Sequence, residues 1–358
     1  MRPDWINDPI PCPSLTHQTR AMDRQNQLTK PPGSLGRLEE MAIRICALQG
    51  RDAPSLDQVR IVVFAGDHGV ARAGVSAYPQ AVTLEMVRNF SRGGAAINVL
   101  ARQLGAHLEV VDVGVAADPG PLPGVISRRA GFGTADFRAA PAMSEAALAV
   151  ACAAGAEAVR RARESGCELF IGGEMGIGNT TAATALACAL LDEPPQRLAG
   201  PGTGLDPAGV ARKVAALEEA LTRHASALTD PWEMLRHLGG FEIAALTGSM
   251  LAAAQQGMPL LVDGFIVSVA ALTAVRLRPE TGSWLLFAHE SAEPGHRAVL
   301  AALQAEPLLR LGMRLGEASG AALAVPLLRC ACALHREMAT FVEAGVSGGV
   351  NKARKKGI

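Results

Sequence analysis

Two places in this sequence combine residue types and surroundings that could perform acid–base chemistry. Asp67 and His68 follow an apolar run and are candidates for an acid–base pair or for metal ligands. A strand-end loop with an Asx turn and a hydrogen-bonded histidine is the structural alternative. No second His/Asp cluster stands at ligand spacing, so we expect no metal site. Glu317 stands among small and apolar residues, where burial would raise its pKa and make it a general base near neutral pH; a helix-terminal glutamate capped by Ser319 is the alternative.

Two glycine-rich segments are candidates for binding an anion. Residues 172–181 follow an apolar run and open an Ala-rich helix, so their backbone N–H groups can approach a ligand. This segment contains a second acid, Glu174, but lacks the spacing of a Walker loop or a dinucleotide fingerprint. Residues 200–206 precede Lys213 by one to two helical turns, which suits a phosphate. On the second segment alone, a plain loop with a surface lysine is the favoured interpretation.

The elements that must position these residues are short apolar runs alternating with longer helical stretches. The runs are residues 60–64, 108–115, 168–171, 259–262 and 284–288. This alternation predicts an α/β fold, a parallel sheet with helices on both faces. Ser144 and Glu145 supply a capping residue and a first-turn carboxylate for one of the helices. Ligands of such sheets bind beyond the carboxyl ends of the strands, where the polar residues of this sequence lie.

Helical sequence at both chain ends predicts a second domain. We expect residues 1–50 and 326–358 to form a small helical domain, and residues 51–325 to form the large α/β catalytic domain. Helical sequence returns after Gly320 and is expected to continue past Glu343. The basic cluster at residues 351–356 is expected to be a solvated tail.

Composition narrows the class of protein. Of the 358 residues, 49% are hydrophobic and 19% are charged, and the formal net charge is zero, which favours a large core and argues against a nucleic-acid binder. The most apolar stretch, residues 321–334, is interrupted by Pro326 and Arg329, so we expect no membrane span. The seven cysteines are scattered and fit the reducing cytoplasm. Buried free thiols in helices are expected at Cys46, Cys152 and Cys188.

Several blocks, taken in order, resemble the family of nicotinate-nucleotide–dimethylbenzimidazole phosphoribosyltransferases. They are KPPGSLGRLE (residues 30–39), DHGV (67–70), GEMGIGNTT (173–181), GGFE (239–242), DGF (263–265), SAE (291–293) and RLGEASGAALA (314–324). The resemblance covers nearly the whole chain. It implies a Rossmann-like sheet with a small helical domain, a homodimer, and no cofactor. It also implies transfer of ribose phosphate from nicotinate mononucleotide to 5,6-dimethylbenzimidazole, giving α-ribazole 5′-phosphate and nicotinate during cobalamin assembly.

The resemblance further implies roles for individual residues. Glu317 would accept the proton of the benzimidazole N–H, and Glu174 would be a second acid near the ribose. The residues implied for binding the base are Tyr78, Met86, Met175 and Leu315. Those implied for the phosphate and ribose are Gly176, Gly178, Asn179, Thr180, Gly202, Gly204, Lys213, Asp263 and Ser291.

The base pocket departs from that of some family members. There, the positions of Tyr78 and Met86 can hold a small polar residue and glutamine, and that of Met175 can hold leucine. The pocket of this chain is therefore bulkier and less polar, which leaves adenine, another benzimidazole or a phenol open as the base. A nucleotide-binding regulator without chemistry is the alternative from another class. The presence of both Glu174 and Glu317 argues against that alternative.

Overall fold

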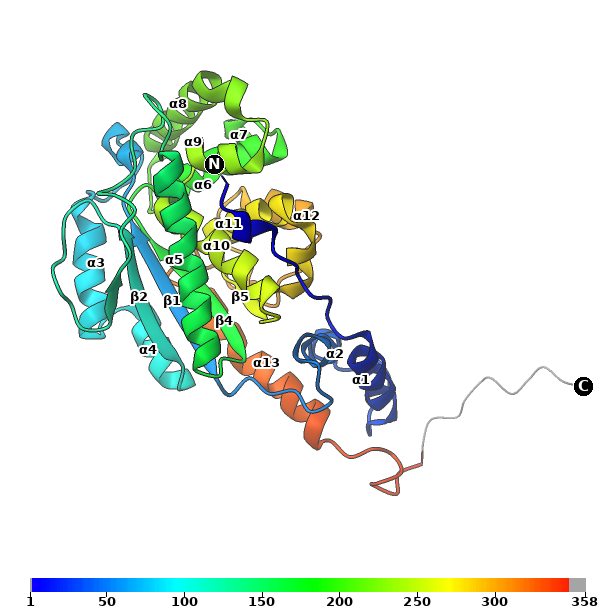
Figure 1. Ribbon diagram of the computed structural model, residues 1–358. Helices are drawn as coiled ribbons and strands as arrows, with labels where there is room; N and C mark the ends of the chain where they lie inside the picture. The colour runs from blue at the N-terminus through cyan, green and yellow to red at the C-terminus, as the bar shows by residue number, and fades with distance from the viewer. Residues whose placement is uncertain (1, 348–358) are drawn as a thin grey trace, which may run out of the picture. The chain divides into compact units, whose positions relative to one another are not determined.

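A six-stranded parallel β-sheet forms the centre of the larger of two compact units (Figure 1). The computed structural model describes residues 2–347. The strands are β1 (Val59–Gly66), β2 (His107–Gly114), β3 (Val125–Ser127), β4 (Leu169–Met175), β5 (Leu260–Val262) and β6 (Leu285–Phe287). Their order is β3-β2-β1-β4-β5-β6, and every neighbouring pair is parallel. The parallel α/β fold predicted from the sequence is thus confirmed.

The two central strands position the residues that follow them. β1 and β4 are almost completely buried, as expected of apolar strands covered on both faces. They pair in register, with Phe64 opposite Glu174 and Ala65 opposite Met175. From β1 the chain proceeds to β2 on one side, and from β4 it proceeds to β5 on the other. Strand order therefore reverses between β1 and β4, and a reversal of this kind opens a crevice at the carboxyl ends of the strands.

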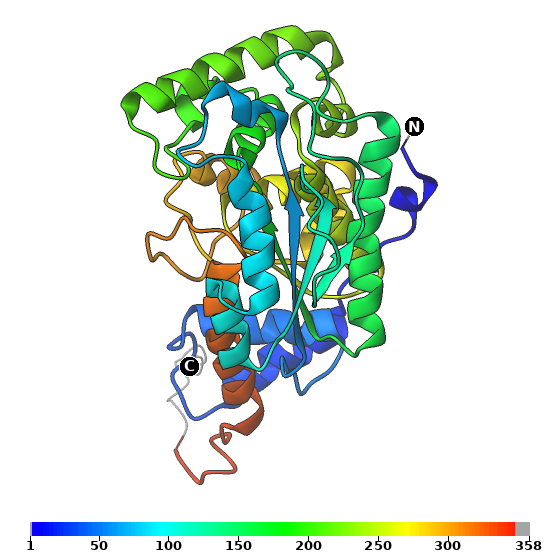
Figure 2. The ribbon, with the colours of Figure 1, turned by 90° about the vertical axis from the view of Figure 1, so that its left-hand side faces the viewer.

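Helices cover both faces of this sheet (Figures 1 and 2). α5 (Glu145–Glu164), α10 (Phe241–Gln255) and α11 (Phe265–Leu277) pack on one face, and α10 is buried along nearly its whole length. α3 (Ala81–Arg92) and α4 (Ala96–Leu104) pack against β1 and β2 on the other face. The remaining helices of this unit are α6 (Asn179–Leu191), α7 (Pro195–Leu198), α8 (Pro207–His224), α9 (Pro231–Leu238) and α12 (His296–Ala302).

The smaller unit is helical and is made from two stretches of chain, residues 13–57 and residues 325–347. The first stretch supplies α1 (Leu15–Gln27) and α2 (Arg37–Gln49), and the second supplies most of α13 (Ser319–Glu337). The Arg24 guanidinium donates to the carbonyl of His335 at 2.6 Å, and Gln25 Nε2 lies 3.0 Å from His335 Nδ1. These contacts join the two stretches through side chains of α1.

The structure corrects three expectations about the elements. Residues 2–12 belong to the larger unit rather than the helical one, and Gln255 Nε2 donates to the Trp5 carbonyl at 2.8 Å. The helix expected past Glu343 ends at Glu337, where a turn closed by the Thr340 N–H and the Glu343 carboxylate follows. β3 was not predicted, because it is only three residues long and partly exposed. Met1 and residues 348–358, which include the expected tail at 351–356, lie outside the described residues.

Other local expectations are confirmed. Ser144 caps α5, because its side chain accepts a hydrogen bond from the Ala147 N–H at 3.1 Å. Cys46, Cys152 and Cys188 are buried free thiols within α2, α5 and α6. None of the helices within residues 2–347 combines the length and apolar character needed to cross a membrane.

Candidate active site

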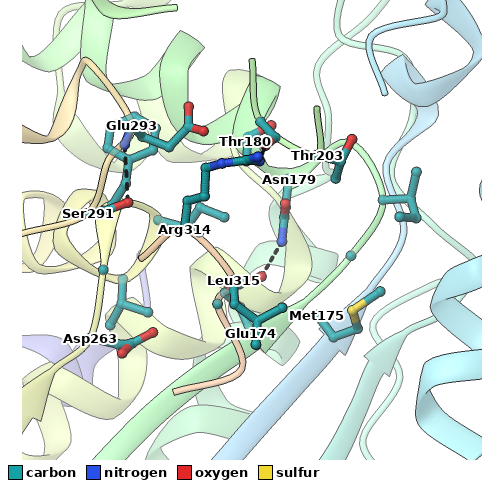
Figure 3. A pocket seen from close by; sticks show the side chains of 18 of the residues that line it. Glu174, Met175, Asn179, Thr180, Thr203, Asp263, Ser291, Glu293, Arg314 and Leu315 are labelled. Carbon is teal, nitrogen blue, oxygen red and sulfur yellow. Dashed lines mark hydrogen bonds between the residues drawn. The ribbon is translucent and has the colours of Figure 1, made fainter. Parts of the chain in front are cut away.

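A pocket opens beyond the carboxyl ends of β4, β5 and β6 (Figure 3). Its walls come from the end of β4, the start of α6, the loop at residues 202–203, the start of α11, the chain after β6 and residues 314–316. The lining residues are Glu174, Met175, Gly176, Ile177, Asn179, Thr180, Gly202, Thr203, Asp263, Gly264, Phe265, Ile266, Val267, His289, Ser291, Glu293, Arg314, Leu315 and Gly316. Segments far apart in the sequence thus meet at the edge of the sheet where parallel α/β folds bind ligands.

Most of the candidate residues from the sequence meet in this pocket. Those that line it are Glu174, Met175, Gly176, Asn179, Thr180, Gly202, Asp263, Ser291 and Leu315. Those outside its lining are Tyr78, Met86, Gly178, Gly204, Lys213 and Glu317. Two residues of the second group adjoin the pocket. Lys213 donates a hydrogen bond to Thr180 in the pocket wall, and Glu317 directly follows Gly316, which lines the pocket. Tyr78 precedes α3, and Met86 lies within it.

Glu174 is a buried acid at the end of β4. The Asn179 side-chain amide donates a hydrogen bond to its carboxylate (Figure 3). Burial raises the pKa of Glu174 well above the ordinary value, and the nearby charges of Glu242, Asp263 and Glu317 raise it further, against the opposing effect of the Asn179 bond. A carboxyl group in this environment is suited to holding a proton or to donating a hydrogen bond.

Glu317 lies just beyond the pocket in a strained stretch of backbone. Glu317 and Ala318 are both left-handed, with φ of 63° and 71°, a conformation that costs a residue with a side chain about 1 kcal/mol or more. The Glu317 carboxylate accepts a hydrogen bond from the Ile97 N–H, in the first turn of α4, at 3.4 Å. Burial raises the pKa of Glu317, the Ile97 bond opposes this rise, and the Asp263 charge adds to it. The direction is the one expected from its apolar sequence context.

Gly316 explains how Glu174 and Glu317 come so near to each other. Its φ is +88°, and a Cβ at this position would collide with the Glu174 carboxylate. On the neighbouring residue of β4, a Cβ at Gly173 would collide with the backbone between Glu317 and Ala318. The segment therefore lies directly on the end of β4, with the Gly316 backbone against the Glu174 carboxylate.

Lys213 is completely buried beneath the loop at residues 200–202. Its ammonium donates to Thr180 Oγ1 at 3.1 Å and to the Gly200 carbonyl at 3.2 Å. Burial lowers the pKa of Lys213 to about 8, although the charge of Glu293 opposes this effect. The alternative of a surface lysine is therefore wrong. Its position beside Thr180 and Gly202, which both line the pocket, suits contact with an anionic ligand.

Three polar groups of the pocket were not predicted from the sequence. Arg314 donates to the Gly202 carbonyl at 2.8 Å, and it is the only Lys or Arg side chain among the described residues that lines the pocket. Glu293 is 5% exposed, and neither of its carboxylate oxygens has a hydrogen-bond partner among the described residues. His289 is 4% exposed and has an unpartnered Nδ1. Arg314 and Glu293 lie within the sequence blocks that resemble the family, so the resemblance could have indicated both residues. His289 lies outside those blocks, and its position just after β6 is the only sign of a role in the site.

Of the four residues expected around the base, Met175 and Leu315 line the pocket, and Tyr78 and Met86 do not. Tyr78 is 55% exposed on a loop, and Met86 is half-buried on α3. Met175 lines the pocket and also packs against a small apolar cluster that contains Val87 of α3. Met175 is thus the link between the pocket and the helix that carries Met86. Leu315 is 58% exposed where it lines the pocket.

Asp67 and His68 are buried and do not line the pocket, and His68 forms an ion pair with Glu242. His68 Nε2 lies 2.6 Å from Glu242 Oε1, and both side chains are fully buried. Burial alone would lower the pKa of His68, but the Glu242 and Asp67 carboxylates outweigh it and raise that pKa. Asp67 accepts from the Ala116 N–H at 2.8 Å. Within residues 2–347, no three His, Cys, Asp or Glu side chains are grouped as they would be to hold a metal ion.

Comparison with known proteins gives one consistent result. Residues 10–346 match the family described as "Phosphoribosyltransferase". A nicotinate-nucleotide–dimethylbenzimidazole phosphoribosyltransferase of Pseudomonas aeruginosa (strain UCBPP-PA14) is 66% identical over 343 residues, which are 96% of this chain and 98% of that protein. The protein of the same name from Azotobacter vinelandii (strain DJ) is 61% identical over 348 residues, which are 97% and 99% of the two chains.

A solved structure agrees with this result. The crystal structure of the nicotinate-nucleotide–dimethylbenzimidazole phosphoribosyltransferase from Thermus thermophilus superimposes with a TM-score of 0.89 at 46% identity. The match covers 94% of this chain and 100% of that one. The likeness in fold therefore extends over the whole of the solved chain.

Proposed function

Because this chain belongs to the nicotinate-nucleotide–dimethylbenzimidazole phosphoribosyltransferase family, we propose that it transfers the phosphoribosyl group of nicotinate mononucleotide to 5,6-dimethylbenzimidazole. The products are α-ribazole 5′-phosphate and nicotinate, and the reaction serves assembly of the nucleotide loop of cobalamin. The observation that carries the proposal is the 66% identity over 96% of the chain to a relative with this name. The enzyme is a pentosyltransferase.

The reaction needs positioning, an anchor for the phosphate and one base. A benzimidazole nitrogen attacks C1′ of the ribose, and the bond from C1′ to the pyridinium nitrogen breaks. The electron pair of that bond neutralises the pyridinium, so nicotinate leaves without a proton. Attack from the opposite face converts the β-nucleotide into the α-ribotide. The proton on the other benzimidazole nitrogen must leave, which is the step that a general base assists.

The phosphate end of the donor is assigned to the loop over Lys213. Lys213 supplies a buried cation beneath Gly202, and the wall beside it carries Thr180 and Gly176. Ser291 lines the same pocket, and its oxygen accepts from the Glu293 N–H at 3.3 Å, which leaves its hydroxyl hydrogen for a ligand. The further residues proposed for the phosphate and ribose are Gly178, Asn179, Gly204 and Asp263.

The base is assigned to the other side of the Leu315–Gly316 backbone. Met175 lines the pocket and also packs against the apolar cluster that contains Val87 of α3. A planar ring bound beside Met175 would therefore lie between the donor and Met86. Glu317 is buried on this side and is the proposed acceptor of the benzimidazole proton. Glu174 is proposed as the acid near the ribose. Tyr78, on its exposed loop, would cover the ring when the base binds.

We also propose that the enzyme acts as a homodimer in the cytoplasm. The dimer is supported by the family resemblance, and the compartment by seven cysteines that are all free thiols. Sedimentation of the purified protein measures the first directly, with a species of twice the 37.1 kDa chain mass as the expected result.

The test of the proposed function is a turnover assay with a panel of bases. Purified protein is mixed with nicotinate mononucleotide and 5,6-dimethylbenzimidazole, adenine, other benzimidazoles or phenols, and the products are identified by mass and anomeric configuration. We expect α-ribazole 5′-phosphate to form fastest. Binding of the nucleotide without release of nicotinate would contradict the proposal and favour a regulator instead.

A further inference from the structure

The hydroxyl of Thr83 links helix α3 to the glycine-rich loop at residues 176–178. Thr83 stands in the first turn of α3 and is completely buried. Its Oγ1 accepts a hydrogen bond from the Ile177 N–H at 3.0 Å, across 94 residues of chain. Ile177 lines the pocket, whereas α3 contributes no residue to the pocket wall. A helix behind the wall of the candidate active site thus bonds directly to the backbone of that wall.

Other buried threonines of this protein use their hydroxyls within their own helices. Thr184, Thr247 and Thr273 each donate to the carbonyl four residues earlier, at 2.6, 2.9 and 2.9 Å. Thr83 instead accepts from a distant loop, which leaves its hydroxyl hydrogen for another acceptor. Burial raises the pKa of Asp67, and the Thr83 hydroxyl is among the hydrogen-bond donors that oppose this rise. The Thr83 hydroxyl therefore joins separate elements of the fold.

The peptide group between Gly176 and Ile177 is held at both ends. Its N–H donates to Thr83, and its carbonyl accepts the Asn179 N–H, at the start of α6, at 3.1 Å. A peptide group is rigid and planar, so a large change in its orientation breaks both hydrogen bonds. The bond from Asn179 stays within the loop and the helix that follows it. The bond to Thr83 is the one that ties this peptide to another element.

Close packing beneath the loop limits where the loop can move. A Cβ built on Gly176 would collide with the Gly66 carbonyl oxygen, and one built on Gly178 would lie 3.1 Å from the Cβ of His68. His68 is itself held by its ion pair with Glu242. A loop released from its bond to α3 would therefore move away from this floor and into the pocket.

The same loop leads into the part of α6 that faces the pocket. Its N-cap residue, Gly178, supplies no side-chain cap to the helix. Thr180 lines the pocket, and its backbone N–H has no acceptor among the described residues. Free N–H groups at a helix start favour an anion, provided that the loop before the helix holds them in place.

We infer that Thr83 is a positioning residue that holds the peptide between Gly176 and Ile177 in the orientation that donor binding requires. The inference rests on the proposed function, which assigns this loop to the donor. Without the hydroxyl, a buried N–H would lack an acceptor, and the peptide would rotate toward another partner. Only the fraction of molecules with the loop in place would bind the donor, so the apparent affinity would fall by that fraction.

The test removes the hydroxyl and keeps the shape of the side chain. Thr83→Val lacks the acceptor, and Thr83→Ser retains it. An unsatisfied buried donor corresponds to roughly 5- to 100-fold in an equilibrium constant. We expect Thr83→Val to raise both KM and the calorimetric Kd for nicotinate mononucleotide about 10-fold, with kcat and KM for the base changed less than about threefold. Thr83→Ser should recover most of the donor affinity. Thr83→Cys, whose sulfur accepts only weakly, is a second variant with the same expected loss.

Thr181 provides a matched control. It lies in the first turn of α6, it is completely buried, and its Oγ1 has no hydrogen-bond partner among the described residues. Thr181→Val makes the same chemical change without removing a hydrogen bond. Its KM for nicotinate mononucleotide should stay within about twofold of the wild-type value.

Hydrogen exchange separates failure of this inference from failure of the proposed function. In the free enzyme, the Ile177 amide should exchange about 10-fold faster or more in Thr83→Val than in wild type or Thr83→Ser. If wild type makes no ribotide from nicotinate mononucleotide, the proposed function fails, and the exchange rate still decides whether Thr83 holds the loop. Wild-type donor affinity in a folded Thr83→Val enzyme, or an equal loss in Thr83→Ser or Thr181→Val, would overturn the inference.

Discussion

Lys213 gives the affinity for the donor a calculable dependence on pH. Burial lowers the pKa of this ammonium from 10.5 to about 8, so its positive charge is lost as the pH rises through about 8. If only the protonated lysine binds the donor's phosphate, the binding constant follows the protonated fraction. That fraction falls about tenfold between pH 7 and pH 9, which corresponds to about 1.4 kcal/mol. The phosphate itself is already largely dianionic in this range, since its second pKa is about 6.

Calorimetry of nicotinate mononucleotide binding at pH 7, 8 and 9 measures this dependence. In buffers with different ionisation enthalpies, binding at pH 9 should take up nearly one proton, because the phosphate restores the charge on Lys213. Lys213→Arg keeps its charge throughout and should bind with nearly constant affinity. Arg212→Ala removes the exposed cation next to Lys213 in α8 and is the matched control, which should retain the tenfold fall.

Two results would refute this reasoning. One is a wild-type affinity that does not change between pH 7 and pH 9. The other is a fall of equal size in a folded Lys213→Arg variant, which would assign the titration to a different group. Thermal denaturation of each variant at each pH shows whether the larger guanidinium is accommodated in the buried site.

The remaining predictions concern the acids and the base pocket. Glu317→Gln should lower kcat about 10²- to 10⁴-fold in single-turnover assays. Wild type should lose activity at acidic pH, because the raised pKa of Glu317 means that this base is protonated at a higher pH than an ordinary glutamate. The variant should not show this loss. Glu174→Gln should raise the free energy of unfolding at pH 7 by roughly 0.5–2 kcal/mol in denaturant titrations, although it lowers turnover. The pKa of Glu174 is higher in the folded protein than in the unfolded chain, so Glu174 destabilises the folded state at any pH above its unfolded pKa. The gain in stability from Glu174→Gln should therefore vanish toward pH 4. Tyr78→Ser combined with Met86→Gln should change the order of preferred bases in competition assays and leave the donor's Kd within about twofold, because neither residue lines the pocket; equal loss for all bases with lower thermal stability would assign both to packing.

The sheet could be predicted because burial on both faces leaves a plain sequence signal. Strands such as β1 must be apolar at nearly every position, so an uninterrupted apolar run followed by glycine and aspartate identifies them. β3 has no such signal, since an edge strand of three partly exposed residues is held by pairing to β2 rather than by burial. The sequence predicts too long a C-terminal helix because helical composition continues beyond Glu337, whereas a local turn at Thr340 decides the end.

The residues of the candidate site that could be predicted from the sequence are those that follow the ends of strands. Glu174, Asp263 and Ser291 lie at or just after the ends of strands, and the parallel topology brings such residues together. The burial of Lys213 depends on how a loop folds over α8, which the spacing of residues does not reveal. Glu317 has a left-handed backbone and accepts a hydrogen bond from Ile97, which is far away in the sequence. Arg314 likewise bonds to a distant residue, Gly202, and the sequence reveals neither contact.

The discontinuous helical unit has a consequence for synthesis of the chain on the ribosome. α1 and α2 emerge first, but Arg24 and Gln25 find their partner, His335, only after residues 58–324 have been translated. At about 5–20 residues per second, these two helices wait roughly a quarter of a minute to a minute for the third. We therefore expect the sheet unit to be completed first and the two N-terminal helices of the helical unit to be packed last.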